Sequence, residues 1–505
     1  MKSLTLSLVT LLLATNIAAQ NDVGEVSFAN SGAAAAQPAF LRGLALLHNF
    51  EYPTAAESFR EAQKIDPEFV MAYWGEAMTY THPVWFQQDA PAARAVLQRL
   101  GATPAERAAK AKSDRERAYL STVEVLYGEG TKEERDFQYA DAMAALHQKY
   151  PDDVDATAFD ALALLGTSHK GRDTATYMRA AALLEEVYPD HQRHPGVLHY
   201  LIHSYDDPVH APLGMRAARR YGAVAPNAGH ALHMTSHIFI AMGMWDDVID
   251  ANVRAIDVVN KQRAARGKSA QNCGHYPTWL HYALLQKHRA EDARKMLDAC
   301  RAAAFNPEFK GSGGFDTEEG RVSSYADMVA SQVMSGGALD HAERVTPSDK
   351  FVEARFTLAY AEAFDAYRRG DAVTLRGVVA RLRALQKEAA AKSEHMEMNM
   401  GMSMNPNNAQ RMAIVVQQVD ALQLAAAGHR EEAVTTLRKA AAAEQAMPYD
   451  FGPPYIEKPT LELLAEQLLA MKRKAEAAEA YRAALARTPG RTIATEGLRT
   501  AAASN

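Results

Sequence analysis

Two pairs of histidines in the middle of the chain have the spacing that metal ligation requires. His199 and His203 are four residues apart, and so are His233 and His237, so each pair lies on one face of a helix. His230 joins the second face three residues before His233. Neutral imidazole nitrogens bind transition-metal ions at about 2.0–2.1 Å, and a helical pair offers two of them without backbone strain. The five histidines therefore predict a metal site.

A second cluster of metal-binding side chains lies between residues 395 and 404, where every second residue is a methionine (Met396, Met398, Met400, Met402 and Met404). Thioether sulfur is a soft donor that selects Cu(I). The segment resembles the Met-x-Met tracts of periplasmic copper-handling proteins. Copper therefore suits both clusters, whereas zinc suits the histidines equally well and leaves the methionines without a role. A polar loop in which methionine happens to recur is the alternative.

The elements that would position these residues repeat along the chain. A pattern of alanine, a large residue, alanine and proline occurs in residues 55–67 and 477–489, with weaker copies in 293–300 and 433–440. The small residues let two antiparallel helices approach closely, the large one fills the gap between them, and the proline ends the second helix. Alanine is abundant and favours helix. Strand signals are scarce, so the sequence predicts an all-α fold.

This pattern resembles the tetratricopeptide repeat (TPR), a helix-turn-helix unit of 34 residues. The resemblance implies a superhelical array of stacked helix hairpins. The chain also resembles a group of exported bacterial TPR proteins with histidine-rich repeats, through its His-Pro-Gly-x2-His and His-Ala-Leu-His stretches. Alignment on the pattern places the beginnings of units near residues 36, 70, 120, 158, 195, 229, 274, 414 and 458.

The expected organisation has five segments. They are a signal peptide (1–19), N-terminal TPR-like repeats with an insertion (36–192), histidine-rich repeats (193–307), a divergent helical segment with the methionine-rich stretch (308–412) and C-terminal repeats (413–505).

The repeat length bears on the histidines, because the two pairs are 34 residues apart. Residues one period apart occupy equivalent places in neighbouring units, so the two pairs can face one shared volume. In TPR proteins the first helices line a concave groove, and the resemblance implies that the five histidines line it. It also places His275 in the slot that His230 fills one unit earlier. Asp206, one turn beyond His203, could add a carboxylate.

Two further histidines, His48 and His82, are also 34 residues apart. They are expected near the ends of two first helices. A histidine near a helix C-terminus interacts favourably with the helix dipole, so a capping role is expected for both.

The first residues of the chain have the character of a leader. Lys2 precedes an apolar run over residues 4–14, and small residues lead to Gln20. The sequence predicts export to the periplasm or secretion. No later segment has about 18 uninterrupted apolar residues, so no membrane span is expected. Cys273 and Cys300 could form a disulfide or remain two reduced thiols.

The remaining composition excludes several functions. Lys and Arg number 55 against 61 Asp and Glu, which gives a net charge of -6, and no basic run carries interleaved aromatics, so nucleic-acid binding is disfavoured. The phosphate-binding loop, the zinc-protease helix, the serine nucleophile elbow and the c-type haem motif are all missing from the sequence.

The sequence therefore predicts an exported TPR-fold protein that binds one or two copper ions on a concave, histidine-lined surface. Storage or delivery of copper fits these residues, and so does copper-dependent oxidation of a small or phenolic substrate by dioxygen. The alternative is an interaction scaffold that grips a peptide or partner protein in the groove without metal. In that case the histidines would form a pH-sensitive peptide surface.

Overall fold

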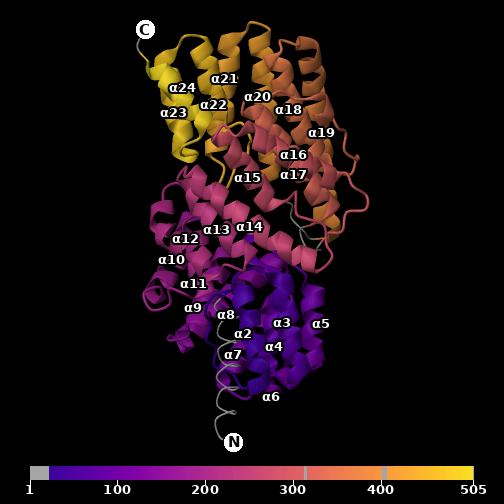
Figure 1. The fold of residues 1–505 in the computed structure, drawn as a ribbon, viewed down its shortest axis with the longest axis vertical. Coiled ribbons are helices and arrows are strands. Elements are labelled where there is room, and N and C mark those ends of the chain that lie inside the picture. Colours follow the sequence, from indigo (N-terminus) through magenta and orange to yellow (C-terminus); the bar gives the residue numbers. More distant parts are fainter. Residues whose placement is uncertain (1–21, 312–315, 401–406, 504–505) are drawn as a thin grey trace, which may run out of the picture. The chain divides into compact units, whose positions relative to one another are not determined.

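The computed structural model of the chain describes residues 22–311, 316–400 and 407–503, without the side chains of residues 342 and 393–400. Helices dominate this part of the chain (Figure 1), and the strands in it are β1 (Thr81–His82) and β2 (Gln87–Gln88), which pair antiparallel. The predicted all-α fold is confirmed. The chain forms two compact units, divided between residues 238 and 239, with residues 207–209 grouped in the second unit.

The first unit comprises residues up to 206 and 210–238. Its helices are η1 (Ala34–Ala36), α2 (Gln37–His48), α3 (Tyr52–Ile65), α4 (Val70–Met78), η2 (Pro83–Trp85), α5 (Ala90–Leu100), α6 (Pro104–Lys110), α7 (Asp114–Leu126), α8 (Lys132–Lys149), α9 (Val154–Leu165), α10 (Thr174–Val187), α11 (Pro195–Tyr205), α12 (Ala211–Val224) and α13 (Gly229–Ala241), the last of which runs three residues beyond the boundary.

The second unit contains the rest of the chain. Its helices are α14 (Trp245–Ala265), α15 (His275–Gln286), α16 (Ala290–Ala304), α17 (Glu318–Met334), η3 (His341–Glu343), α18 (Val352–Arg368), α19 (Ala372–Met400), α20 (Asn407–Ala426), α21 (Arg430–Gln445), α22 (Thr460–Ala470), α23 (Lys474–Arg487) and α24 (Thr492–Ala502). Within each unit, most helices that follow one another along the chain pack together as hairpins, so the molecule is a helix-hairpin array of the TPR kind.

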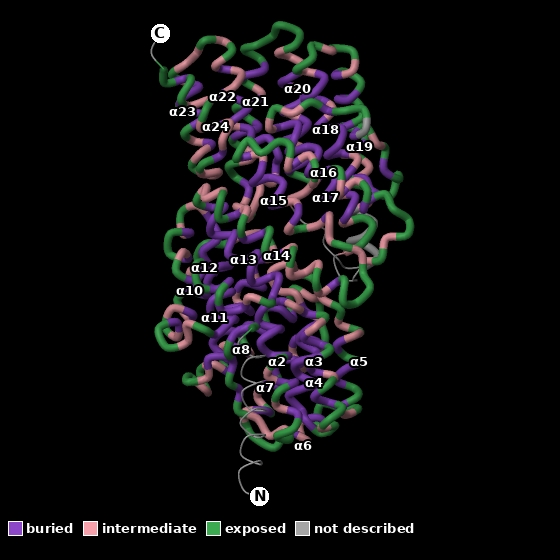
Figure 2. The backbone as a smooth tube through the Cα atoms, viewed as in Figure 1, coloured by how far each residue is buried: buried purple, intermediate pink, exposed green. Residues whose placement is uncertain are grey.

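The repeated alanine-and-aromatic pattern explains how the hairpins pack. Phe59 of α3 is fully buried between two glycines: a Cβ on Gly43 of α2 would lie 2.9 Å from its ring, and one on Gly75 of α4 would lie 2.4 Å from it. Tyr481 of α23 packs on Gly497 of α24 in the same way, since a Cβ on Gly497 would lie 2.2 Å from the Tyr481 ring. Each large ring therefore fills a space that only glycine leaves open. Figure 2 shows the result, with buried stretches along the helices and exposed residues at their connections.

The 34-residue period separates the starts of α11 and α13, the helices that carry the five histidines, whereas α15 begins 46 residues after α13. The unit beginnings expected near residues 195, 229 and 274 coincide with the starts of α11, α13 and α15. The boundary between the compact units falls inside the segment 193–307 that the sequence treats as one domain. The division into five segments stays a prediction. That prediction does not include the grouping of the helices into two compact units.

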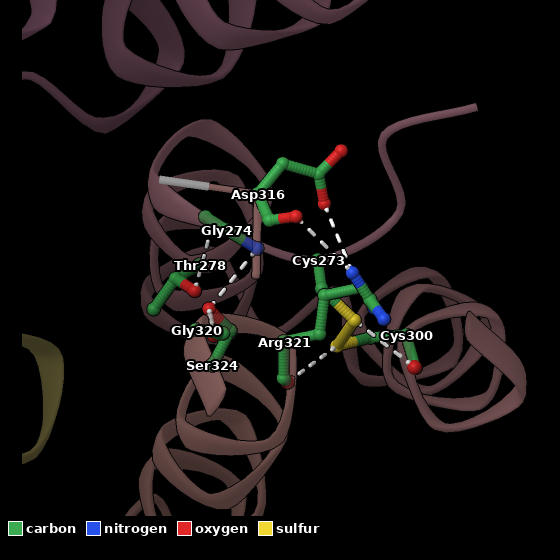
Figure 3. Close-up of a disulfide and its surroundings, with 8 residues drawn as sticks. All are labelled: Cys273, Gly274, Thr278, Cys300, Asp316, Gly320, Arg321 and Ser324. Carbon is green, nitrogen blue, oxygen red and sulfur yellow. Dashed lines mark hydrogen bonds and ion pairs between the residues drawn. A yellow bond between two sulfur atoms is a disulfide. The ribbon is translucent and has the colours of Figure 1, made fainter. Parts of the chain in front are cut away.

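A disulfide joins Cys273 and Cys300 in the second unit (Figure 3), with a Cα–Cα distance of 4.8 Å. It ties the segment before α15 to the last part of α16. The backbone N–H of Gly274 donates to the hydroxyl of Ser324 on α17 at 3.0 Å, so three consecutive helices meet around the bridge. Of the two states that the sequence leaves open, the structure has the bridged one.

Some predictions fall outside the described residues. The signal peptide (1–19) does, as do Met402 and Met404, and the side chains of Met396, Met398 and Met400 are also not described. None of the described helices combines the length and apolar character that crossing a bilayer requires.

Candidate metal centre

Five imidazoles gather in the interior of the first unit, supplied by α11 and α13. Neighbouring rings form a closed circle, and each of the five histidines is at most 5% exposed. The distances between ring centroids are 4.9 Å for His199–His203, 5.4 Å for His203–His237, 5.1 Å for His237–His233, 6.0 Å for His233–His230 and 5.0 Å for His230–His199. Two imidazoles bound to one ion at tetrahedral angles have centroids about 5 Å apart, so this spacing suits shared ligation.

The start of α11 shows why the sequence His194-Pro195-Gly196 precedes His199. The Nδ1 atom of His194 caps the helix by accepting from the backbone N–H of Val197 at 3.3 Å, and Pro195 occupies the first turn, where its missing N–H is harmless. A Cβ on Gly196 would lie 2.3 Å from Nδ1 of His48, so only glycine admits the His48 ring here. The motif thus brings the end of α2 against the first ligand helix.

His199 is held in one orientation by that contact. Its Nδ1–H donates to the backbone carbonyl of His48 at 2.6 Å, which leaves Nε2 as the unprotonated nitrogen. That Nε2 is buried and has no hydrogen-bond partner among the described residues. Donor nitrogens of His199, His203 and His230 all lie within 4.8 Å of one another. A bound ion would satisfy the Nε2 atom of His199, whose burial without a partner is otherwise unfavourable.

Asp206 orients two more imidazoles. Its Oδ2 lies 3.0 Å from Nδ1 of His237 and 3.5 Å from Nδ1 of His203, while its Oδ1 accepts from Arg172 at 2.5 Å. The sequence predicts Asp206 as a ligand, and the distances allow that role, since donor atoms of Asp206, His203 and His237 all lie within 4.8 Å of one another. Its contacts are those of a carboxylate that fixes the Nδ1 side of each ring and directs Nε2 away.

The second helical pair shows the most specific distance in the cluster. The Nε2 atoms of His233 and His237 are 3.2 Å apart. Two nitrogens bound to one ion at 2.0–2.1 Å and tetrahedral angles are separated by about 3.3 Å. Because Nδ1–H of His237 donates to Asp206, Nε2 of His237 carries the lone pair and accepts from Nε2–H of His233 in this structure. A metal ion bound between the two rings would take the place of that proton.

Burial favours the neutral form of three of these imidazoles. It lowers the pKa of His199 and of His230 well below the ordinary value of 6.5, and it lowers the pKa of His237 to about 4. Burial alone would raise the pKa of Asp206, but the Arg172 guanidinium and the hydrogen bonds from His203 and His237 hold it below its usual range. Neutral imidazole is the form that binds a metal ion.

Several residues around the cluster escape the sequence analysis. Phe50 adopts a left-handed backbone (φ 57°) just after α2, where glycine is usual, and its ring packs on His199 with centroids 4.3 Å apart. The ring of Trp85 lies 5.7 Å from that of His230, and Glu51 accepts from the backbone N–H of His230 at 3.0 Å. No spacing or motif in the sequence marks these residues. In the structure, Phe50 is recognised by its strained left-handed backbone, which is unusual for a bulky residue.

The capping roles expected for His48 and His82 are wrong. His48 does end α2, but it is buried, and burial lowers its pKa to about 4, so it carries no charge for the helix dipole at neutral pH. Instead its Nε2 lies 2.9 Å from Oδ1 of Asp155, which also accepts from His194 at 3.2 Å. His82 lies in β1, four residues after the end of α4, and stacks on Tyr52 with ring centroids 4.1 Å apart.

The expectation that the histidines line an open concave surface is also wrong. Packing of α11 and α13 against the rest of the first unit buries all five rings, since every residue of α11 is buried. His275 begins α15 in the second unit, where its ring lies 5.2 Å from that of Trp279, and its role as a ligand stays a prediction. The same holds for the methionine-rich stretch.

Comparisons with known proteins give a fold-level similarity only. No protein-family model matches the chain. No curated relative matches it either. Among solved structures, the chain is similar to the Cut9–Hcn1 hetero-tetramer of the APC/C (10% identity, 99% of this chain and 82% of that one, TM-score 0.37) and to yeast Tom70 (12% identity, 92% and 95%, TM-score 0.30). It is also similar to the human IFIT1 dimer with m7Gppp-AAAA (13% identity, 97% and 95%, TM-score 0.34).

Proposed function

We propose that the first unit binds a transition-metal ion through imidazoles of His199, His203, His230, His233 and His237. The observation that carries this proposal is the 3.2 Å distance between the Nε2 atoms of His233 and His237, with Nδ1 of His237 bonded to Asp206. A hydrogen-bond acceptor on Nδ1 behind each ligand nitrogen is the arrangement that raises ligand basicity and fixes ring orientation at metal sites.

Copper is the proposed metal, with zinc as the alternative. Imidazole ligands suit both ions, so the cluster by itself does not choose between them. The run of methionines in residues 396–404 favours copper, because thioethers bind Cu(I) and give zinc no ligand. Copper also stands above zinc in intrinsic affinity for nitrogen sites.

Storage or delivery of copper suits the site better than oxidation of an organic substrate. The five histidines are 0–5% exposed, so a phenol cannot touch an ion held between them in this structure. The sequence identifies no acid or base for such a reaction. The proposed activity is therefore capture and holding of the ion.

Export to the periplasm or secretion is part of the proposal. The leader in residues 1–19 predicts it, and the Cys273–Cys300 disulfide supports it, because such bridges persist in oxidising compartments.

Elemental analysis of untagged protein tests the proposal. We expect stoichiometric copper in the wild-type chain and its loss in H199A/H233A. The matched control is H147A, because His147 pairs with Asp160 at 3.0 Å on another helix. Zinc in place of copper would support the site and overturn the choice of metal. Wild-type protein that holds neither ion after loading would overturn the metal proposal.

A second candidate function is that of an interaction scaffold. Helix-hairpin arrays present extended binding surfaces, and the fold belongs to that class. The second unit also has a solvent-open pocket, lined in part by Trp245, Tyr282, Tyr449, Tyr455, Pro448 and Pro454. Aromatic and proline side chains of this kind suit an extended, proline-containing peptide. The buried histidines cannot form the peptide surface that the sequence suggests.

Peptide binding in chelator separates the two functions. A proline-rich decapeptide titrated in EDTA should change the fluorescence of Trp245 if the cavity is the scaffold site, and W245F should remove that signal. No saturable change at millimolar peptide would contradict the scaffold.

A further inference from the structure

The five imidazoles form two ligand sets. His199, His203 and His230 have donor nitrogens within 4.8 Å of one another, whereas His233 and His237 form a pair with Nε2 atoms 3.2 Å apart. The widest gap in the circle of rings, 6.0 Å, separates His230 from His233, although both lie on α13. Three residues are about five-sixths of a helical turn, so the two rings leave the helix in different directions.

The circle is too wide for one ion. Five imidazoles that bind a single ion in one plane would have neighbouring centroids about 3.7 Å apart, because each centroid would lie about 3.2 Å from the ion. The observed separations of 4.9–6.0 Å are all larger. They match instead the spacing of about 5 Å that tetrahedral ligation gives within each set.

One carboxylate links the two sets. Oδ2 of Asp206 contacts Nδ1 of His203, which belongs to the first set, and Nδ1 of His237, which belongs to the second. Asp206 therefore orients a ligand for each of two ions, while Arg172 compensates its charge on the other oxygen.

The surroundings favour ions of low charge. Imidazole binds a metal ion in its neutral form, and Asp206, the carboxylate that contacts His203 and His237, is already paired with Arg172. The free energy of burying an ion grows with the square of its charge, so a divalent ion costs about four times as much as a monovalent one in the same place. Two divalent ions would leave four uncompensated charges in this interior, and two monovalent ions would leave two.

We infer that the first unit holds two Cu(I) ions, one on His199, His203 and His230 and one on His233 and His237. The second ion has two protein ligands in this unit and takes an exogenous ligand in its open position. This inference rests on the proposed function, since it concerns the same imidazoles.

Anaerobic titration with Cu(I) against a chromogenic chelator tests the inference on the full chain. We expect the wild-type protein to withdraw two equivalents. H199A/H230A and H233A/H237A should each withdraw one, and H147A should withdraw two. Loading with Zn²⁺ should give fewer than two equivalents, because the charge argument applies to divalent ions.

The outcomes separate this inference from the proposed function. One equivalent in the wild-type chain would overturn the second ion and keep the metal site. Withdrawal of no Cu(I) by the wild-type chain would overturn both the second ion and the metal site. Loss of both ions in each double variant, with the helix content of both variants unchanged by circular dichroism, would overturn the division into two independent sets. The wild-type stoichiometry decides the matter even if a variant fails to fold.

Discussion

The two compact units each bury a polar cluster among their helices, and the two clusters are built in opposite ways. In the second unit, Arg491 is 1% exposed and binds Glu462 with Nε–Oε2 and Nη2–Oε1 distances of 2.6 and 3.1 Å, while Lys458 reaches the same carboxylate at 2.8 Å. Tyr282 accepts from Arg491 at 2.8 Å. Charges of opposite sign meet directly in this cluster.

The cluster of the first unit consists of imidazole rings whose nitrogens converge on one another. Asp206, the carboxylate that contacts the rings of His203 and His237, lies behind those rings rather than among them. Nε2 of His199 has no partner among the described residues. A buried network whose charges are paired serves stability. Imidazole nitrogens that converge on one another suit a bound metal ion instead. Metal dependence should therefore be confined to the first unit.

The largest expected effect on stability comes from breaking the ionic cluster of the second unit. R491A leaves Glu462 with Lys458 as its remaining cation and should lower the free energy of unfolding by about 3–5 kcal/mol. Urea unfolding measures this. The matched control is R473A, because Arg473 pairs with Glu476 on the surface, where solvent screens the ion pair, and its loss should lower the free energy of unfolding far less. Equal losses in both variants would contradict the structural role of the buried cluster.

Removal of the disulfide should also affect the second unit alone. C273S/C300S opens a loop closed across 27 residues, which should destabilise that unit by about 3 kcal/mol. Copper stoichiometry should stay at the wild-type value, since the ligands lie in the first unit. A parallel loss of copper in protein that remains folded would count against the separation of the two units.

In the first unit, D206N should weaken copper binding without abolishing it. Loss of the negative charge behind His203 and His237 reduces ligand basicity, and such changes typically reduce affinity about 10–100-fold. Competition with a Cu(I) chelator gives the affinity. D152N, at an exposed position, is the control and should bind like wild type. An unchanged affinity in D206N would show that Asp206 does not position the ligands.

The smallest expected effect is the loss of stability of the second unit at acid pH. Burial alone would raise the pKa of Glu462, but Arg491 and Lys458 hold it at about 2, below the ordinary 4.5. A depressed carboxyl pKa contributes stability that is complete above about pH 4.5 and lost as the pH falls toward 2. The difference in urea midpoint between wild type and E462Q should therefore shrink from pH 6 to pH 3. A constant difference would contradict the ion pair.

The sequence predicts the array and the ligand helices because both depend on local spacing. The i,i+4 pairs and the 34-residue offset place His199, His203, His233 and His237 on two helices one repeat apart, as observed in α11 and α13. Burial of the cluster is not predictable in this way, because it depends on α2 closing over α11 through His48 and Phe50, which are about 150 residues away along the chain. The role of Arg172 could not be predicted for the same reason, because its contact with Asp206 arises only when the helices pack.

X-ray absorption at the copper edge of loaded wild-type protein tests the central claim most directly. The account predicts nitrogen neighbours at about 2.0 Å, with the outer-shell pattern of imidazole rings and two to three histidines per ion. That signal should fall in H199A/H233A. A first shell of sulfur at about 2.3 Å would place the copper on methionines instead, and the buried histidines would then be a hydrogen-bonded core with no ion.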